Sequence, residues 1–339
     1  MTGNDNPAAL SASVAATVMP RHVVLVAFDG VEAIDVAGPA SAITKAAQCV
    51  PGAYRLTIAS PSGGDVTTNA GLTIAATKAL HTMAAPIDTL IVAGGDEPAL
   101  RAAIETQGVG DWVARTAPRV RRVASVCTGA FALAAAGILD GRQCTTHRNA
   151  CTMLQTMFPQ TRVLHDPIYV RDDPVWTSAG VTTGLDMTLA MIAADLGQAV
   201  AVEIARNLAV FMVRGSADPQ ESRALAAQAQ AAPRMRDLVA WIMGNLTGDL
   251  CVAALAERAR MSPRNFARTF LAETGSTPAA FVTQARVDRA AALLMQTEWP
   301  QEKIARESGF GSADAFQRAF SGQMGDTPEV YRARRKSLL

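Results

Sequence analysis

The chain has 339 residues, of which 49% are hydrophobic and 18% are charged, and its formal net charge is +1. These values are typical of a soluble globular protein with two or three domains. No uncharged stretch reaches the roughly 18 apolar residues that a membrane span requires, so we expect no membrane partner. The five cysteines are scattered without a framework spacing, which favours the reducing cytoplasm over a secreted disulfide scaffold.

The first part of the chain predicts a tail followed by an α/β domain. Residues 1–20 are rich in alanine, serine and threonine and lack a basic cluster before an apolar run, so we expect a disordered tail and no signal peptide. From 21 to 213, short β-branched runs alternate with alanine-rich stretches, and 185–213 is typical of one long amphipathic helix. This alternation predicts a flavodoxin-like α/β domain, in which helices cover both faces of a parallel sheet.

A linker and a helical domain are expected in the remainder. Residues 214–233 begin with small and polar residues and continue as an alanine- and glutamine-rich run, which is typical of a linker. Residues 234–336 show helical periodicity interrupted by glycine and proline, which predicts an all-α domain. Residues 233–339 contain 15 Lys+Arg against 11 Asp+Glu, while residues 1–232 contain 16 against 19. This basic surplus suits nucleic-acid binding.

A candidate reactive turn lies in the α/β domain. The strand expected at 120–126 runs directly into Cys127 and then a helix. A thiol on such a sharp turn lies near helix N–H groups, which are expected to lower the thiol pKa and to bind an anion. His147 is a candidate base, and the backbone of Gly94 and Gly95, at the end of another strand, can act as an oxyanion hole. Because these features follow parallel strands, they predict one ligand site at the sheet edge.

Cys144, His147 and Cys151 have a spacing that resembles that of metal ligands. A structural zinc takes four ligands, and no fourth cysteine or histidine lies close in the sequence. We therefore expect neither a metal nor another cofactor.

The helical domain contains an internal repeat. Serine, phenylalanine, arginine and phenylalanine recur at one spacing: Ser262, Phe266, Arg268 and Phe270, then Ser312, Phe316, Arg318 and Phe320. Residues four apart share a helix face, so each helix is expected to bury its phenylalanines and to present its arginine outward. Both serines suit helix N-caps. A short helix and a tight turn precede each copy, which predicts two helix-turn-helix motifs whose second helices enter DNA major grooves. A long helix from 278 to 296 would hold the two motifs on successive grooves.

The sequence of residues 235–336 resembles the AraC/XylS-type DNA-binding domain, with Gly309-Phe310-x-Ser312, Phe316, Phe320 and Thr327-Pro328-x-x-Tyr331-Arg332 as its most specific stretch. The resemblance implies a sequence-specific transcription regulator that binds a double-stranded DNA operator, acts as a homodimer and allows a contact with RNA polymerase. The DNA-binding positions that it implies are Ser262, Arg264, Asn265, Arg268, Ser312, Asp314, Gln317 and Arg318. Arginine suits guanine, and asparagine or glutamine suits adenine.

Residues 21–213 resemble the PfpI-like branch of the class I glutamine amidotransferase fold. The matching segments are Asp29-Gly30-x4-Asp35-x2-Gly38-Pro39, Ala93-Gly94-Gly95, Ser125-Val126-Cys127-Thr128-Gly129-Ala130, Gly141-Arg142-x3-Thr146-His147 and Thr177-Ser178-Ala179-Gly180. By this resemblance Asp35 approaches the Cys127 thiol. The ligand-binding residues would be Asp35, Gly94, Gly95, Cys127, Thr128 and His147.

The resemblance leaves three functions open for this domain. Fused to an AraC-type module, it implies a sensor for a small, nitrogen-containing effector, and this is the interpretation that we favour. Alternatively, it is a cysteine-dependent hydratase or amide hydrolase in which Cys127, His147 and Asp35 are catalytic. The third option is a structural or dimerising remnant.

Overall fold

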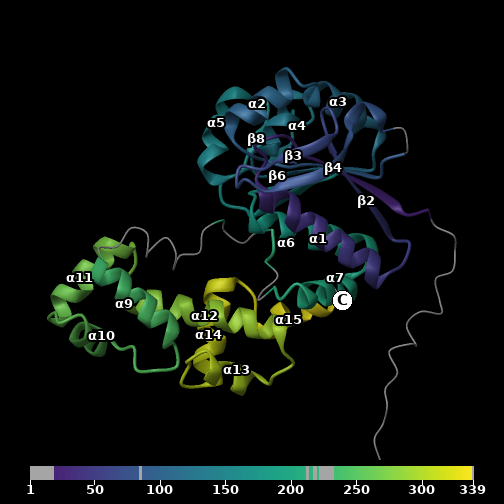
Figure 1. The fold of residues 1–339 in the computed structure, drawn as a ribbon. Helices are drawn as coiled ribbons and strands as arrows, with labels where there is room; N and C mark the ends of the chain where they lie inside the picture. The colour runs from purple at the N-terminus through teal and green to yellow at the C-terminus, as the bar shows by residue number, and fades with distance from the viewer. Residues whose placement is uncertain (1–18, 84–85, 211–213, 217–219, 221–232, 338–339) are drawn as a thin grey trace, which may run out of the picture. The chain divides into compact units, whose positions relative to one another are not determined.

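The computed structural model describes residues 19–83, 86–210, 214–216, 220 and 233–337. The tail predicted at 1–20 and the linker predicted at 214–233 therefore lie almost entirely outside the described residues. The chain divides into two compact units, the first mainly of residues up to Leu208 and the second mainly of residues from 218 onward. The first unit is α/β and the second is all-α, which confirms the predicted fold class (Figure 1).

The first unit is built on an eight-stranded sheet with the order β3-β4-β2-β1-β5-β6-β10-β9. The strands are β1 (Arg21–Val26), β2 (Tyr54–Ser60), β3 (Gly64–Thr67), β4 (Thr73–Ala79), β5 (Thr89–Val92), β6 (Arg122–Val126), β9 (Tyr169–Asp172) and β10 (Val175–Ser178). The six inner strands pair in parallel, and the edge strands β3 and β9 are antiparallel to their neighbours. A separate two-stranded sheet pairs β7 (Gln143–Cys144) with β8 (Arg162–Val163).

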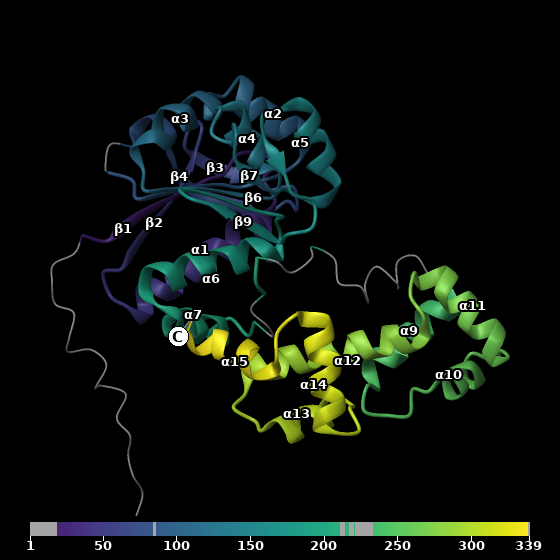
Figure 2. The same cartoon turned by 180° about the vertical axis from the view of Figure 1, so that it is seen from behind.

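Helices cover both faces of this sheet, as Figures 1 and 2 show. They are α1 (Ala33–Cys49), α2 (Glu97–Glu105), α3 (Val109–Thr116), α4 (Ala130–Ala135), α5 (Cys151–Met157), α6 (Thr182–Leu196) and α7 (Gln198–Asn207), with short 3-10 turns at η2 (Leu80–Thr82), η3 (Ala117–Arg119), η4 (Cys127–Gly129) and η5 (Arg148–Ala150). Helices α1 and α6 pack together on one face, and α2, α3 and α4 lie on the other. Because both faces are covered, β5 and β6 are buried at every position. Strand β5 is apolar after its first residue, whereas β6 also buries Arg122 and Ser125.

The single long helix predicted over 185–213 is wrong. Helix α6 ends at Leu196, Gly197 adopts a left-handed conformation (φ +89°), and a separate helix, α7, follows. A left-handed residue cannot continue a right-handed helix, and glycine adopts this conformation without steric cost. The last residues of the predicted helix, 211–213, lie outside the described residues.

The second unit consists of α9 (Pro233–Gly244), α10 (Val252–Arg258), α11 (Pro263–Thr274), α12 (Pro278–Gln296), α13 (Gln301–Glu307), α14 (Ala313–Met324) and α15 (Pro328–Ser337). Ser262 caps α11 and Ser312 caps α14, each by accepting a hydrogen bond from a backbone N–H three residues on (3.4 and 3.1 Å). Both predicted N-caps are thereby confirmed. The pairs α10–α11 and α13–α14 are the two predicted helix-turn-helix motifs.

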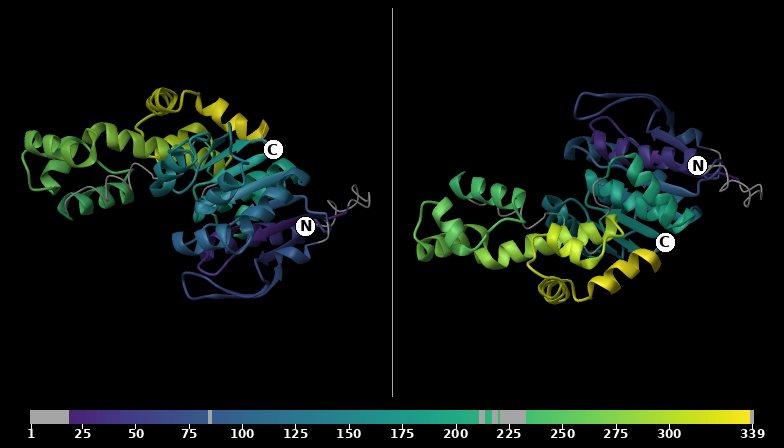
Figure 3. Two further views of the ribbon diagram at one scale, coloured as in Figure 1. Left: turned by 90° about the horizontal axis from the view of Figure 1, so that it is seen from above. Right: turned by 90° about the horizontal axis from the view of Figure 1, so that it is seen from below.

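Two separate apolar cores hold these motifs. One core contains the fully buried Phe266 and Phe270, and the other contains the fully buried Phe316 and Phe320. Helix α12 contributes to both: its first half supplies Phe281, Val282 and Ala285 to the first core, and its second half supplies Val287, Ala290, Ala291 and Leu294 to the second. Figure 3 shows the first half of this unit in green and the second in yellow, joined through this helix.

Candidate functional site

Cys127 lies on a strained turn at the end of β6. Its φ is +55°, in the left-handed region that residues with a side chain rarely adopt, and a 3-10 turn separates it from α4. Such a backbone costs about 1–3 kcal/mol and persists only where its surroundings enforce it. Two glycines leave the room that this turn needs: a Cβ added to Gly180 would lie 2.3 Å from the Cys127 Cβ, and one added to Gly94 would lie 2.8 Å from it.

Asp35 is the buried carboxyl group beside this thiol. It lies in the first turn of α1, with no exposed surface. Its Oδ1 accepts a hydrogen bond from the Val181 N–H at 2.7 Å, and its Oδ2 accepts one from the Gly94 N–H at 3.2 Å. The Cys127 thiol is also hydrogen-bonded to this carboxyl group. Three segments that are distant in the sequence therefore meet at one carboxylate.

The two acids hold their protons more tightly than usual. Burial raises the pKa of Asp35 to about 6, although the hydrogen bond from Val181 opposes this shift. Burial, with a further contribution from the charge of Asp35, raises the pKa of Cys127 to about 12. The prediction that the turn lowers the thiol pKa is therefore wrong, because loss of solvent and a neighbouring carboxylate outweigh the backbone donors. At neutral pH the thiol is protonated and donates to an ionised Asp35.

The pKa of Asp35 predicts a pH-dependent contribution to stability. A carboxyl group whose pKa is raised on folding stabilises the fold while it is protonated, and this stabilisation is lost as the pH rises through its folded-state pKa. Between about pH 3 and pH 7, the free energy of unfolding of the wild type minus that of Asp35→Asn should fall by about 3 kcal/mol. Urea unfolding at several pH values measures this difference. Other carboxyl groups cancel in the subtraction, and a flat difference would contradict the raised pKa.

The predicted oxyanion hole is not preformed. The Gly94 N–H donates to Asp35, and the Gly95 N–H donates to Thr128 Oγ1 at 3.0 Å. The Thr128 hydroxyl in turn donates to the carbonyl oxygen of Gly95 at 3.1 Å. The two glycine N–H groups thus bind protein side chains and hold the Cys127 turn against the end of β5.

His147 lies near this turn without a hydrogen bond to it. Thr146 Oγ1 donates to the carbonyl oxygen of Cys127 at 2.8 Å, which brings the segment after β7 to the turn. The His147 side chain is half-buried, and within the described residues no hydrogen bond joins its imidazole to the thiol. The structure therefore brings together Asp35, Gly94, Cys127 and Thr128, and adds Val181, which the sequence analysis did not find. Val181 acts through its backbone N–H and has a φ of +52°, and neither property can be recognised in the sequence.

The cysteines weighed for a metal site are both buried, and Cys151 Sγ lies 3.5 Å from the Thr146 carbonyl oxygen. Across the described ranges, no group of three His, Cys, Asp or Glu side chains could hold a metal ion.

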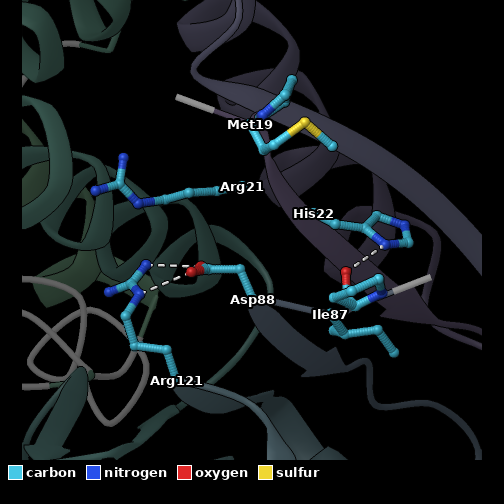
Figure 4. A pocket seen from close by; sticks show the side chains of 8 residues that line it. Met19, Arg21, His22, Ile87, Asp88 and Arg121 are labelled. Atoms are coloured by element: carbon cyan, nitrogen blue, oxygen red, sulfur yellow. Dashed lines mark hydrogen bonds and ion pairs between the residues drawn. The ribbon is translucent and has the colours of Figure 1, made fainter. Parts of the chain in front are cut away.

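A hollow of about 440 Å³ lies at the end of the sheet opposite to Cys127, where β1 and β5 begin (Figure 4). Its lining residues are Met19, Pro20, Arg21, His22, Pro86, Ile87, Asp88 and Arg121. Arg121 binds Asp88 through two hydrogen bonds of 2.9 and 2.7 Å, and both ring nitrogens of His22 lie within hydrogen-bond distance of protein oxygens. These groups already satisfy one another, so the thiol end of the sheet remains the better candidate for recognising a ligand.

The outer faces of α11 and α14 form the candidate nucleic-acid interface. All four of their phenylalanines are fully buried, while the side chains of Arg264, Arg268, Asp314, Gln317 and Arg318 are exposed. Within α11, Arg268 Nη2 donates to the half-buried Asn265 Oδ1 at 2.9 Å, so two candidate base-reading side chains are already paired.

Of the described helices, none is both long and apolar enough to cross a membrane.

Comparison with known proteins agrees with this arrangement. A model described as the DJ-1/PfpI family matches residues 21–194, slightly more than half of the chain, and a helix-turn-helix domain model matches residues 255–334. The HTH-type transcriptional regulator CdhR of Pseudomonas aeruginosa is 29% identical over 83% of this chain and 82% of its own length. An HTH-type transcriptional regulator of Mycobacterium tuberculosis is 31% identical over 73% of this chain and 95% of its own length.

Two further matches concern the α/β fold. The crystal structure of a ThiJ/PfpI family protein from Pseudomonas syringae has a TM-score of 0.54 and 24% identity, covering 76% of this chain and 96% of that one. An isonitrile hydratase of Pseudomonas putida is 30% identical over 44% of this chain and 66% of its own length. The fold and the matches together define a transcriptional regulator of the helix-turn-helix class. The chain belongs to the DJ-1/PfpI family, and its helical unit is an AraC-type DNA-binding domain.

Proposed function

We propose that the α/β unit binds a small, nitrogen-containing effector beside Cys127, and that binding controls operator occupancy by the helical unit. The effector site would consist of Asp35, Gly94, Gly95, Cys127, Thr128 and His147. The observation that carries this proposal is the protonated Cys127 thiol hydrogen-bonded to the buried Asp35. A thiolate is the nucleophilic form of cysteine, so a thiol with a raised pKa suits recognition better than covalent catalysis.

The chemistry of Asp35 supports a nitrogen-containing effector. A carboxylate has about four acceptor positions, and the N–H groups of Val181 and Gly94 and the Cys127 thiol use three of them. An amine or amide N–H would reach the remaining lone pair through a local opening of the site, because the Asp35 carboxyl group has no exposed surface. Because Asp35 has lost its solvent, a cationic donor would gain more from it than a neutral one.

In the helical unit, we propose that α11 and α14 read the operator. The proposed contacts are Ser262, Arg264, Asn265 and Arg268 from the first motif, and Ser312, Asp314, Gln317 and Arg318 from the second. A homodimer would place these motifs on paired half-sites. We further propose that the protein acts in the cytoplasm and that RNA polymerase is a further partner. For the domain organisation, we propose a disordered tail at 1–20, an effector domain at 21–213, a linker at 214–233 and a DNA-binding domain at 234–336.

The proposed base contacts are tested at Arg318. Its exposed guanidinium can bind a guanine edge, and truncation should cost about 1–3 kcal/mol of operator binding and relax the preference at one base pair. The measurement is fluorescence anisotropy of Arg318→Ala with the operator and with single-base operator variants. Arg101→Ala on α2 removes one positive charge from the other unit and is the matched control. Equal affinities for the Arg318→Ala variant and the wild type would remove Arg318 from the interface.

The second candidate function is a cysteine-dependent hydratase or amide hydrolase. It is favoured by the left-handed Cys127 turn, which is typical of a nucleophile, and by the similarity to an isonitrile hydratase. Under this alternative Cys127 would attack the substrate, with Asp35 and His147 transferring protons.

Cys127→Ser distinguishes the two functions. Serine keeps a hydroxyl donor toward Asp35, so a sensor should retain effector binding to within about threefold, whereas an enzyme should lose its turnover. Small amines, betaines and amino acids are screened first by thermal shift, since a ligand at 100 times its Kd should stabilise the fold by about 2.7 kcal/mol. Positive compounds are then tested for an effect on operator binding. Hydration of isonitriles by the wild type, abolished in Cys127→Ser, would replace the sensor with the enzyme.

A further inference from the structure

The two helix-turn-helix motifs make their turns with the same backbone hydrogen bonds. In the first, the N–H of Arg260 donates to Glu257 and that of Met261 to Ala256, at 2.8 and 2.9 Å. In the second, the corresponding N–H groups are those of Gly309, which donates to Arg306 at 3.0 Å, and Phe310, which donates to Ala305 at 2.8 Å. This pair of bonds is the Schellman motif that ends a helix, and it requires a left-handed residue at the first turn position.

The two motifs fill this left-handed position differently. In the second motif it is Gly309 (φ +88°), and the packing requires a glycine, because an added Cβ would lie 1.9 Å from the carbonyl oxygen of Leu246. In the first motif it is Arg260 (φ +49°). Glycine is the usual residue there, and an arginine reduces stability because its Cβ crowds the backbone. The first motif therefore carries a strained arginine where the second has an unstrained residue.

Nothing within the fold accounts for this arginine. The Arg260 side chain is exposed, and in the described part of the chain it has no ion pair or hydrogen bond. Its neighbour Arg258 differs, because its guanidinium lies 3.9 Å from the centre of the Trp241 ring and so packs within the unit. A residue held in a sparsely populated conformation without an internal partner points to a role outside the fold.

The charge around Arg260 shows what it could bind. From Val252 to Thr274, the first motif carries four arginines and two glutamates, whereas the second, from Gln301 to Met324, carries three basic and three acidic residues. In a helix-turn-helix, the first helix crosses the DNA backbone and the first residues of the second helix meet the base edges. The turn between them lies at the rim of the groove, where the nearest DNA groups are phosphates.

We propose that Arg260 binds a DNA backbone phosphate at the edge of the groove that α11 enters. The contact anchors the first motif irrespective of base sequence, and the strained turn is retained because it presents the guanidinium beside the reading helix. The proposal depends on DNA binding by the helical unit and is independent of the effector and of Cys127.

The test is Arg260→Gly in the full chain, with a duplex of mixed sequence as the probe, since a phosphate contact does not require the operator. Glycine relieves the strain, so the unfolding temperature should rise. The affinity at low salt should fall by about fivefold to tenfold, and the slope of log K against log salt concentration should become shallower by about 0.9. A stabilised protein that binds DNA more weakly is the expected result. Unchanged affinity and slope, or a lowered unfolding temperature, would overturn the proposal.

Three further variants separate the effect of the Arg260 charge on DNA affinity from the effect of the backbone conformation of the turn. Arg260→Lys keeps the charge and should keep the salt slope, while Arg260→Asn tolerates the left-handed conformation and should behave as Arg260→Gly does. Arg101→Ala makes the same change in net charge in the other unit and should leave DNA binding unchanged. If Arg101→Ala weakens binding as much as Arg260→Gly, the effect belongs to net charge and the phosphate contact is wrong.

Discussion

Gly180→Ala should destabilise the α/β unit by roughly 2–6 kcal/mol and abolish the effector response. Gly180 has a φ of +101°, and an added Cβ would lie 2.3 Å from the Cys127 Cβ and 2.7 Å from its Sγ. Neither atom can move freely, because Cys127 is held in its own left-handed turn. The alanine must therefore shift either the Cys127 thiol, which is part of the proposed effector site, or the segment whose Val181 N–H holds Asp35 in that site.

Gly52→Ala is the matched control for this substitution. Gly52 also has a positive φ, +82°, but nothing lies within 4 Å of an added Cβ. It should therefore show the backbone cost alone, about 1–2 kcal/mol. Urea unfolding gives the stability of both variants, and effector-dependent thermal shift gives the response. If the two alanines have equal effects, contact with Cys127 does not fix the geometry of the site.

Phe316→Ala should destabilise the second helix-turn-helix motif by about 3–5 kcal/mol. Phe316 is fully buried, and its ring centre lies 5.5 Å from that of Phe320 and 5.6 Å from that of Phe310. Removing the ring leaves a cavity beneath α14 and loses two aromatic contacts. Because the two cores of the helical unit share no buried residue, the loss should be largest in the second motif.

Hydrogen exchange can locate this loss. Amides of α13 and α14 should lose protection in Phe316→Ala, while those of α10 and α11 should keep most of theirs. Leu271→Ala on α11, where the side chain is 46% exposed, is the control and should change stability little. Equal loss of protection in both motifs would show that the unit unfolds as one body and that the two cores are not energetically separate.

The helical unit could be predicted in detail because its signals are local. The start of α12 at Pro278 follows from a threonine cap and a proline in the first turn, and its last residue is Gln296, as predicted. In α11 and α14 the phenylalanines are four residues apart and therefore share one helix face. The buried phenylalanines and the exposed arginines of each helix could both be deduced from this spacing.

The proposed effector site could be predicted only in part. The turn around Cys127 was predicted from the strand-to-helix pattern and the carboxyl group of Asp35 from the family resemblance, but the shift of the thiol pKa was predicted with the wrong sign. That sign depends on burial and on a contact between residues 35 and 127, which no local pattern records. The edge strands β3 and β9 and the two-stranded sheet of β7 and β8 were also missed, because each has only two to four residues.

Helix α12 has a consequence for how the operator can evolve. Its 19 residues span about 28 Å, and it supplies side chains to the cores beneath α11 and α14, the two helices proposed to read the operator. A half-turn insertion in the DNA, about five base pairs, would rotate one contacted groove to the far side of the duplex, and α12 cannot lengthen to follow it. Base substitutions within the two contacted DNA segments are therefore changes that selection can retain. Insertions between these segments should be eliminated, because one of the two motifs would lose its contact.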